Sequence, residues 1–160
     1  MATYFLTMDS PIGFLRLSSD ENQLKSISFD AEAIEDPTTL PGVLIEARKQ
    51  LNEYFSGTRC HFELPLAPDG SDFQQLVWKQ LAEVPFGSTR SYLDIAKALG
   101  SETSSRAVGM ANGRNPIPLV IPCHRIIGQN GKLTGYAGGL ARKKWLLIHE
   151  RTFTGGEGLF

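Results

Sequence analysis

The chain has 160 residues, of which 41% are hydrophobic and 21% charged, and its formal net charge is −1. This length and composition are typical of one globular domain or two small ones, and no apolar run approaches the roughly 18 residues of a membrane span. The N-terminus lacks the features of a signal peptide, and two cysteines, Cys60 and Cys123, cannot make a disulfide framework. We therefore expect a reducing compartment, the cytoplasm.

The charge is distributed unevenly along the chain. Residues 1–72 carry five Lys/Arg and twelve Asp/Glu, a net charge of −7. Residues 73–160 carry eleven Lys/Arg and five Asp/Glu, a net charge of +6. The second half either has an ordinary basic surface or binds a polyanion.

Residues 1–68 predict a small scaffold domain. Residues 3–29 are rich in Phe, Leu, Ile and Thr and contain two turn signals, which predicts three short antiparallel strands. Apolar residues recur at helical spacing over 43–55, which predicts an amphipathic helix. Another strand is expected over 61–66. No residue here indicates catalysis, and we expect Cys60 to be inert.

Residues 72–160 predict a second, mostly helical domain. Asp72, with Gln75 three residues later, matches a capping box at the start of a helix. Two further helices are expected over 91–99 and 104–112. A glycine-containing turn joins them, so the pair predicts a helix-turn-helix.

The second helix of this pair is made largely of small residues. Ala107, Gly109 and Ala111 lie in it, Arg106 lies near its start, and Arg114 follows its end. A mid-helix glycine costs about 1 kcal/mol relative to alanine, so a reason for it is expected. The small residues could pack tightly against a neighbouring helix, or they could approach a nucleic-acid groove closely with Arg106 as the reaching side chain. The two explanations are compatible on opposite faces.

Residues 116–125 form an apolar run with three prolines, in which Cys123 is followed by His124. The run predicts a short buried strand over 119–121, and Pro122 restricts the backbone just before the cysteine. A free cysteine is most often a small buried hydrophobe. A neighbouring histidine, however, can lower the pKa of the thiol and produce a nucleophilic thiolate. Adjacent Cys-His pairs lack the ligand spacing of structural zinc sites, so we expect no metal.

The last segments are a glycine-rich loop and a helix. Five glycines fall within residues 128–139, where Tyr136 is the only aromatic residue. This loop is either a flexible turn or the wall of a pocket for a flat ligand. The helix expected over 140–151 places Lys143 outward, and Glu150 at its end. A carboxylate at a helix C-terminus opposes the helix dipole, so Glu150 should have a compensating partner.

Together these motifs resemble the O6-alkylguanine-DNA alkyltransferases, also called methylated-DNA–protein-cysteine methyltransferases. The resemblance covers residues 72–151 almost continuously and is carried by Arg106–Gly109, Asn115–Pro116, Ile121–Arg125, Tyr136–Gly139 and Trp145–Glu150. It implies an α+β fold, in which a small N-terminal domain with antiparallel strands and a helix precedes a mostly helical, winged-helix-like domain with the helix-turn-helix. It also implies a monomer that binds double-stranded DNA containing O6-alkylguanine, needs no cofactor, and does not involve a membrane. Some members of the family bind zinc through N-terminal cysteines and histidines, but this chain lacks that set, so no metal is expected.

The resemblance further implies a repair protein in which each molecule acts once. Cys123 would take the alkyl group from O6 of guanine, and less well from O4 of thymine, as a stable thioether. By the same resemblance, His124 would accept the proton of Cys123 through a water, and Glu150 would hold and polarise His124. Asn115 would fix the turn before the nucleophile.

The DNA-binding roles carry over in the same way. The target base must leave the duplex, which costs a few kcal/mol. Tyr92 would help to rotate the nucleotide and donate toward N3 of guanine, and Arg106 would fill the gap in the base stack. Ala107 and Gly109 would lie in the minor groove, with Arg114 as a further DNA contact.

The family also implies a base pocket. Tyr136 would form its wall, and the backbone N–H of Ala137 would donate to the base. The carbonyls of Cys123 and Ile126 would accept from the exocyclic amine of guanine, and Trp78 is counted with the substrate-binding residues.

Two other functions are compatible with parts of this pattern. One is a non-catalytic, lesion-binding alkyltransferase-like protein of the same fold, but that group has tryptophan where this chain has Cys123. The other is a Cys-His hydrolase acting on a small molecule. A hydrolase regenerates its cysteine, whereas the transferase stops after one equivalent.

Overall fold

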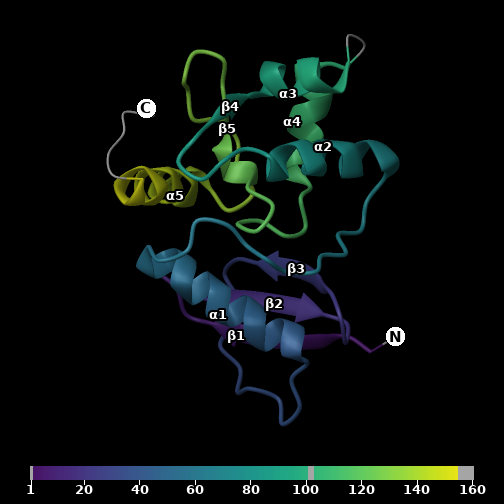
Figure 1. Cartoon of the computed structure of the whole chain (residues 1–160), viewed down its shortest axis with the longest axis vertical. Helices are drawn as coiled ribbons and strands as arrows, with labels where there is room; N and C mark the ends of the chain where they lie inside the picture. Colours follow the sequence, from purple (N-terminus) through teal and green to yellow (C-terminus); the bar gives the residue numbers. More distant parts are fainter. Residues whose placement is uncertain (1, 101–102, 155–160) are drawn as a thin grey trace. The chain divides into compact units, whose positions relative to one another are not determined.

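The computed structural model describes residues 2–100 and 103–154 (Figure 1). The chain divides into two compact units. Unit 1 comprises Met1–Asp69 with Pro116–Pro118, and unit 2 comprises Gly70–Asn115 with Leu119–Phe160. Among the described residues, no helix is long and apolar enough to cross a lipid bilayer.

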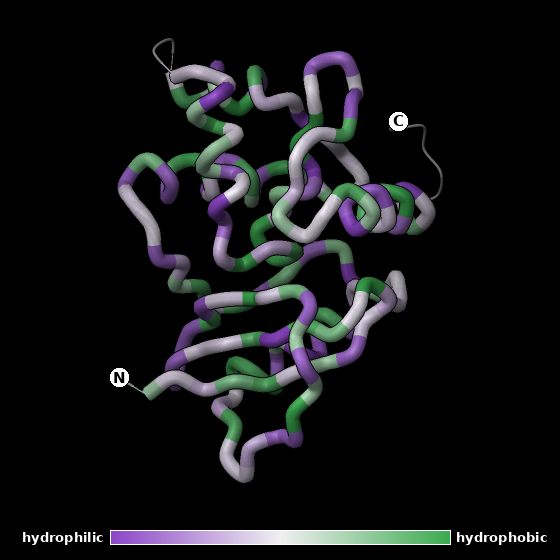
Figure 2. The backbone as a smooth tube through the Cα atoms, turned by 180° about the vertical axis from the view of Figure 1, so that it is seen from behind, coloured by the Kyte–Doolittle hydropathy of each residue, from purple (hydrophilic) through white to green (hydrophobic). Residues whose placement is uncertain are grey.

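Unit 1 is built on an antiparallel sheet with strand order β1-β2-β3. Its strands are β1 (Tyr4–Met8), β2 (Leu15–Ser19) and β3 (Leu24–Ser28). Helix α1 (Gly42–Ser56) contacts all three strands and buries Leu44 and Leu51 completely. Apolar and polar residues are interleaved along these elements, as Figure 2 shows, so each buries one face and exposes another. The predicted strands and helix are confirmed.

The strand predicted over 61–66 is not formed. Leu66 makes only a single parallel bridge with Leu24 of β3. Two hydrogen bonds form this bridge. The Leu24 N–H donates to the Pro65 carbonyl at 2.8 Å, and the Ala67 N–H donates to the Leu24 carbonyl at 2.9 Å. Pro65 has no N–H to donate, so a longer ladder cannot form through it.

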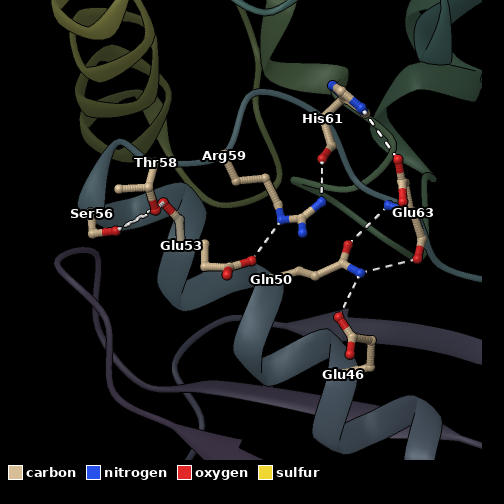
Figure 3. A network of polar contacts seen from close by, with 8 residues as sticks. All are labelled: Glu46, Gln50, Glu53, Ser56, Thr58, Arg59, His61 and Glu63. Carbon is tan, nitrogen blue, oxygen red and sulfur yellow. Dashed lines mark hydrogen bonds and ion pairs between the residues drawn. The ribbon is translucent and has the colours of Figure 1, made fainter.

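A buried amide on α1 fixes this segment instead (Figure 3). Gln50 is only 3% exposed. Its Nε2 donates to the Glu63 carbonyl at 3.1 Å and to Glu46 Oε2 at 2.9 Å, and its Oε1 accepts from the Glu63 N–H at 2.9 Å. Beside it, Arg59 forms an ion pair with Glu53 at 2.8 Å. Side-chain hydrogen bonds therefore replace the missing strand ladder.

Unit 2 is mostly helical. Its helices are α2 (Asp72–Ala82), α3 (Tyr92–Leu99), α4 (Ser105–Gly113), the short 3-10 helix η1 (Cys123–Arg125) and α5 (Leu140–Phe153). Two short strands, β4 (Arg90–Ser91) and β5 (Ile126–Ile127), pair in parallel. Helices α3 and α4 pack together as the predicted helix-turn-helix. The capping box of α2 lies one residue earlier than predicted, because Ser71 accepts from the Gln74 N–H and Gln74 bonds back to Ser71.

The strand predicted over 119–121 is also wrong. Leu119 has φ of 75°, in the left-handed region, and lies in a turn. Pro118 and Pro122 on either side lack N–H groups, which disfavours a sheet ladder here. The preceding residues belong to unit 1, where the Ile27 N–H of β3 donates to the Pro116 carbonyl at 3.0 Å.

Candidate active site

Cys123 lies at the start of η1, directly after a tight turn. Pro122 has φ −80° and ψ 65°, and the Cys123 N–H donates to the Ile121 carbonyl at 2.8 Å. These values match an inverse γ-turn, whose central φ the proline ring already favours. The sequence therefore restrains the backbone just where the thiol is attached, and the thiol is buried, with Cys123 5% exposed.

Two asparagines hold this turn, one in the last turn of α4 and one just after the helix. Asn115 Nδ2 donates to the Ile121 carbonyl, six positions further along the chain, at 2.7 Å. Asn112, buried in α4, donates from Nδ2 to the Cys123 carbonyl at 3.4 Å. Sequence reasoning selected Asn115 and missed Asn112, which reads in sequence as an ordinary helix-terminal residue.

A buried charge cluster lies behind the cysteine. Glu150 of α5 meets His124 Nε2 at 2.5 Å through one oxygen, and Arg125 Nε at 2.8 Å through the other. Arg125 makes a second contact with it through Nη2 at 3.1 Å, and the Gly87 N–H donates to it at 3.3 Å. Burial raises the pKa of Glu150, but His124 and Arg125 outweigh burial and lower it below its usual range. Glu150 is therefore a carboxylate, and Arg125 is the partner that sequence reasoning missed.

Only one of the two ring nitrogens of His124 forms a hydrogen bond with a described residue. Its Nε2 faces the Glu150 carboxylate, which can only accept a hydrogen bond and so favours the tautomer protonated at Nε2. Its Nδ1 is buried and has no hydrogen-bond partner among the described residues. Burial lowers the pKa of His124, against the opposing effect of Glu150. The imidazole is therefore neutral, and Nδ1 carries a lone pair that can accept a proton.

The thiol is not the low-pKa group that its histidine neighbour led us to expect. Burial raises the pKa of Cys123 to about 11, although side-chain hydrogen bonds with Asn115 and Tyr136 and the charge of Lys143 act in the opposite direction. A thiolate in an apolar site loses its hydration, and this loss outweighs the neighbouring dipoles. Without DNA, the cysteine is therefore protonated at neutral pH.

Lys143 of α5 was predicted to point outward but is fully buried. Its Nζ donates to the Ile126 carbonyl at 2.5 Å and to the Thr134 carbonyl at 2.8 Å. Burial lowers its pKa to about 8, and Cys123 opposes that shift. Lys143 thereby ties β5 and the glycine-rich loop to α5.

A cavity of about 620 Å³ opens beside these groups in unit 2. Its lining residues come from α3, α4 and the glycine-rich loop: Tyr92, Ser105, Arg106, Gly109, Gly113, Thr134, Gly135, Tyr136 and Ala137. Five residues predicted from the sequence therefore share one cavity. Neither Cys123 nor Ile126 is among the lining residues, but Tyr136 and Cys123 interact through their side chains.

Three other residues that were predicted to bind DNA or the substrate also lie outside this lining. Trp78 is 2% exposed, and its Nε1 donates to the Ala111 carbonyl of α4 at 2.9 Å, so it packs the helices and does not line the cavity. The backbone N–H of Ala107 donates to Ser104 Oγ at 3.1 Å, and this bond caps the N-terminus of α4. Arg114 is exposed at the C-cap of α4.

Packing does not explain the glycine of α4. A Cβ placed on Gly109 would lie 3.7 Å from the Tyr92 ring, an ordinary contact, with nothing else within 4 Å. The small residue is therefore not needed for contacts within the described chain, unlike Ala111, which is buried. The part of the chain that the structure describes also contains no group of three or more His, Cys, Asp or Glu residues suited to a metal ion.

Comparisons with known proteins agree with this geometry over both units. The family profile described as 6-O-methylguanine DNA methyltransferase, DNA binding domain, matches residues 72–152, and that of the ribonuclease-like domain matches residues 3–68. Methylated-DNA–protein-cysteine methyltransferases from Methanosarcina acetivorans and Mycobacterium tuberculosis are 48% and 45% identical. These matches cover 90% and 93% of this chain, and 96% and 93% of the relatives.

A solved structure matches equally well. The crystal structure of Mycobacterium tuberculosis OGT in complex with DNA aligns with a TM-score of 0.85 and 45% identity, over 94% of each chain. The relatives bear the name of the catalytic transferases, which favours the catalytic interpretation of this chain over a non-catalytic lesion-binding one. The chain belongs to the methylated-DNA–protein-cysteine methyltransferases, DNA repair enzymes that take alkyl groups from DNA.

Proposed function

We propose that Cys123 is the residue that accepts the alkyl group from O6 of guanine, and that the transfer is irreversible. The observation that supports this most strongly is the buried His124–Glu150 pair with its open Nδ1. A histidine oriented by a carboxylate, next to a cysteine, is the arrangement that activates a thiol nucleophile. It is also the arrangement that a purely structural cysteine would not need.

The proposed transfer is a single displacement. The Cys123 sulfur forms a bond to the alkyl carbon as the bond from that carbon to O6 breaks, and its electron pair stays on the guanine. The thiol proton passes through a water to His124 Nδ1, while Glu150 stabilises the imidazolium. The guanine then takes up a proton and is restored. No step of this reaction breaks the new thioether, so each protein molecule reacts once.

The resting thiol fits a trigger by the substrate. With a pKa of about 11, the thiol stays protonated until a base occupies the site. Its proton then moves only when the alkyl carbon is in place, which protects Cys123 from other electrophiles. Asn115 and Asn112 keep the turn, and so the sulfur, in position through their bonds to Ile121 and Cys123.

The cavity is the proposed site of the extruded base. Tyr136 and Ala137 wall it, and the Ile126 carbonyl, which already accepts one bond from Lys143, has a second lone pair for the exocyclic amine of guanine. Arg106 is exposed on α4, where its side chain can enter the gap left in the duplex. We keep Tyr92 as the group that rotates the nucleotide and donates to N3.

Several finer points also stay proposals. We assign alkyl transfer and DNA binding to a domain of residues 72–160, because every proposed site residue falls there, and a scaffold role to residues 1–68. O4-alkylthymine as a weaker substrate and the monomeric state rest on the family resemblance. A cytoplasmic location is supported by the two free thiols.

Mass spectrometry tests the proposal directly. After incubation with duplex DNA containing O6-methylguanine, the peptide that holds Cys123 should gain one methyl group, at one equivalent per protein molecule. The Cys123→Ala variant should bind the same DNA and leave it methylated. Transfer that survives in this variant, or turnover beyond one equivalent, would contradict the assignment.

A further inference from the structure

The base pocket contains a hydrogen bond between the loop and the helix-turn-helix. Thr134 Oγ1 donates to the hydroxyl oxygen of Tyr92 at 3.1 Å, and the two residues are 42 positions apart in the sequence. Tyr92 is the first residue of α3, and both residues line the 620 Å³ cavity. The bond therefore joins two separate elements of the cavity wall, the glycine-rich loop and α3.

The direction of this bond determines what the phenol can do. Because Thr134 is the donor, the Tyr92 oxygen acts as acceptor and its own proton is not used. Among the described residues, Tyr92 makes no other side-chain hydrogen bond. A hydroxyl that accepts one hydrogen bond is polarised and becomes a better donor in the next. The phenol proton is thus available to a group inside the cavity.

Thr134 is itself held in place by a buried group. Its carbonyl accepts from Lys143 Nζ at 2.8 Å, and the same ammonium donates to the Ile126 carbonyl of β5. Lys143 is completely buried, so its preferred position is set by these two acceptors. The backbone of Thr134 is fixed from α5, and its side chain then reaches Tyr92. Flexible glycine-rich chain on either side would not provide this precision.

We propose that Thr134 is a positioning residue, whose hydroxyl orients the Tyr92 phenol and directs its proton toward N3 of the base in the pocket. This inference rests on the proposed function, since it needs an extruded guanine in the cavity. As the alkyl carbon leaves O6, negative charge spreads over the purine, including N3. A donor already oriented toward N3 stabilises that charge without reorganising during the transfer.

The test compares Thr134→Val, which keeps the side-chain shape and removes the hydroxyl, with Thr134→Ser, which keeps the hydroxyl. Single-turnover transfer from O6-methylguanine in duplex DNA should be about three- to tenfold slower in Thr134→Val, the effect of one hydrogen bond. Thr134→Ser should recover most of the rate. In a Tyr92→Phe background, Thr134→Val should cause no further loss, because the bond is already absent.

A modified substrate separates positioning from a general loss of structure. O6-methyl-3-deazaguanine has a C–H group in place of N3, so the wild type and Thr134→Val should react with it at the same rate. A matched control is Thr152→Val on α5, whose hydroxyl donates to the Ile148 carbonyl at 2.8 Å on the exposed side of the helix. It should react like the wild type with both substrates.

The outcomes distinguish the two proposals. If the wild type leaves Cys123 unmodified, the proposed function fails. If the wild type reacts and Thr134→Val matches it on O6-methylguanine, or exceeds it, only the role of Thr134 is overturned. An equal loss on the 3-deaza substrate would also overturn it. Should Thr134→Val fail to fold, Thr134→Ala is expected to show the same selective loss and carries the same test.

Discussion

Each unit has a polar side chain buried on a helix, and the two differ in a telling way. Gln50 on α1 and Glu150 on α5 are 3% and 0% exposed, and each bonds groups distant in sequence. Gln50 is neutral, and its amide has partners at both ends (Figure 3). Glu150 is charged, pairs with Arg125 and His124, and leaves His124 Nδ1 open.

The difference teaches how to separate a structural cluster from a catalytic one. A neutral group with all its bonds made holds two segments together at little electrostatic cost. A buried charge costs several kcal/mol to desolvate, even when it is paired. The proposed proton transfer gives a reason to keep such a group, with an open polar atom beside a cysteine, that stability alone does not give. Substitutions of Glu150 and Gln50 test this distinction, because the first should slow alkyl transfer and the second should lower stability alone.

The largest effect is expected for Glu150→Gln. This change removes the charge that neutralises Arg125 and orients His124, so transfer should slow by about 100-fold or more, as for loss of a general base. The free energy of unfolding should fall by about 3–5 kcal/mol, because a buried arginine is left unpaired. Transfer assays and urea unfolding at neutral pH measure both.

The stability loss should depend on pH with a definite sign. The folded-state pKa of Glu150 is lowered, so its stabilisation is present above the ordinary carboxyl pKa of about 4.3 and is lost as the pH falls below that value. The difference between wild type and Glu150→Gln should therefore shrink in acid. Glu46→Gln on α1 is the matched control, and it should change neither the transfer rate nor the free energy of unfolding. A constant difference across pH would show that the carboxylate charge is not responsible.

Much of the site could be predicted from the sequence because short-range chemistry marks it. Pro122-Cys123-His124 are consecutive, and a carboxylate at the end of α5 required a partner. Lys143 could not be placed in this way. Lysine is usually exposed, and only the folded chain shows the two carbonyls, of Ile126 and Thr134, that make its burial possible.

The remaining errors have the same origin. The apolar residues over 119–121 suggested a strand, but the flanking prolines decided the backbone. The pKa of Cys123 was expected to fall because His124 is adjacent in sequence. Burial, which depends on the whole of unit 2, raised it instead. Local motifs and the family resemblance thus marked the groups that we propose to react, and long-range packing sets their protonation states.

A second prediction concerns this thiol. With a pKa near 11 instead of the ordinary 9.0, Cys123 without DNA should have about 100-fold less thiolate at neutral pH than an unperturbed cysteine. Alkylation by iodoacetamide, measured in the Cys60→Ser variant, should rise about tenfold per pH unit until the pH nears 11. A plateau near pH 7 would mean that the resting cysteine is already ionised, and that the open Nδ1 of His124 is not needed as a proton acceptor.

The smallest effect is expected on the structural side, for Gln50→Ala. Removing the amide leaves the Glu63 N–H and carbonyl without their partner on α1. Because the Glu63 side chain is exposed and water can reach this segment, the loss should be about 1–2 kcal/mol of unfolding free energy. Circular dichroism is the suitable probe, since both tryptophans, Trp78 and Trp145, lie in unit 2. Asn52→Ala, on the exposed face of the same helix, should change stability by less than about 0.5 kcal/mol.

The transfer assay decides whether Gln50 belongs on the structural side of the comparison. Folded Gln50→Ala protein should still place one methyl group on each Cys123, at the rate of the wild type. Within the described part of the chain, the amide forms hydrogen bonds only with α1 and the segment around Glu63. A slower transfer by fully folded protein would show that unit 1 contributes to the reaction. A satisfied, neutral cluster would then no longer be sufficient evidence of a purely structural role.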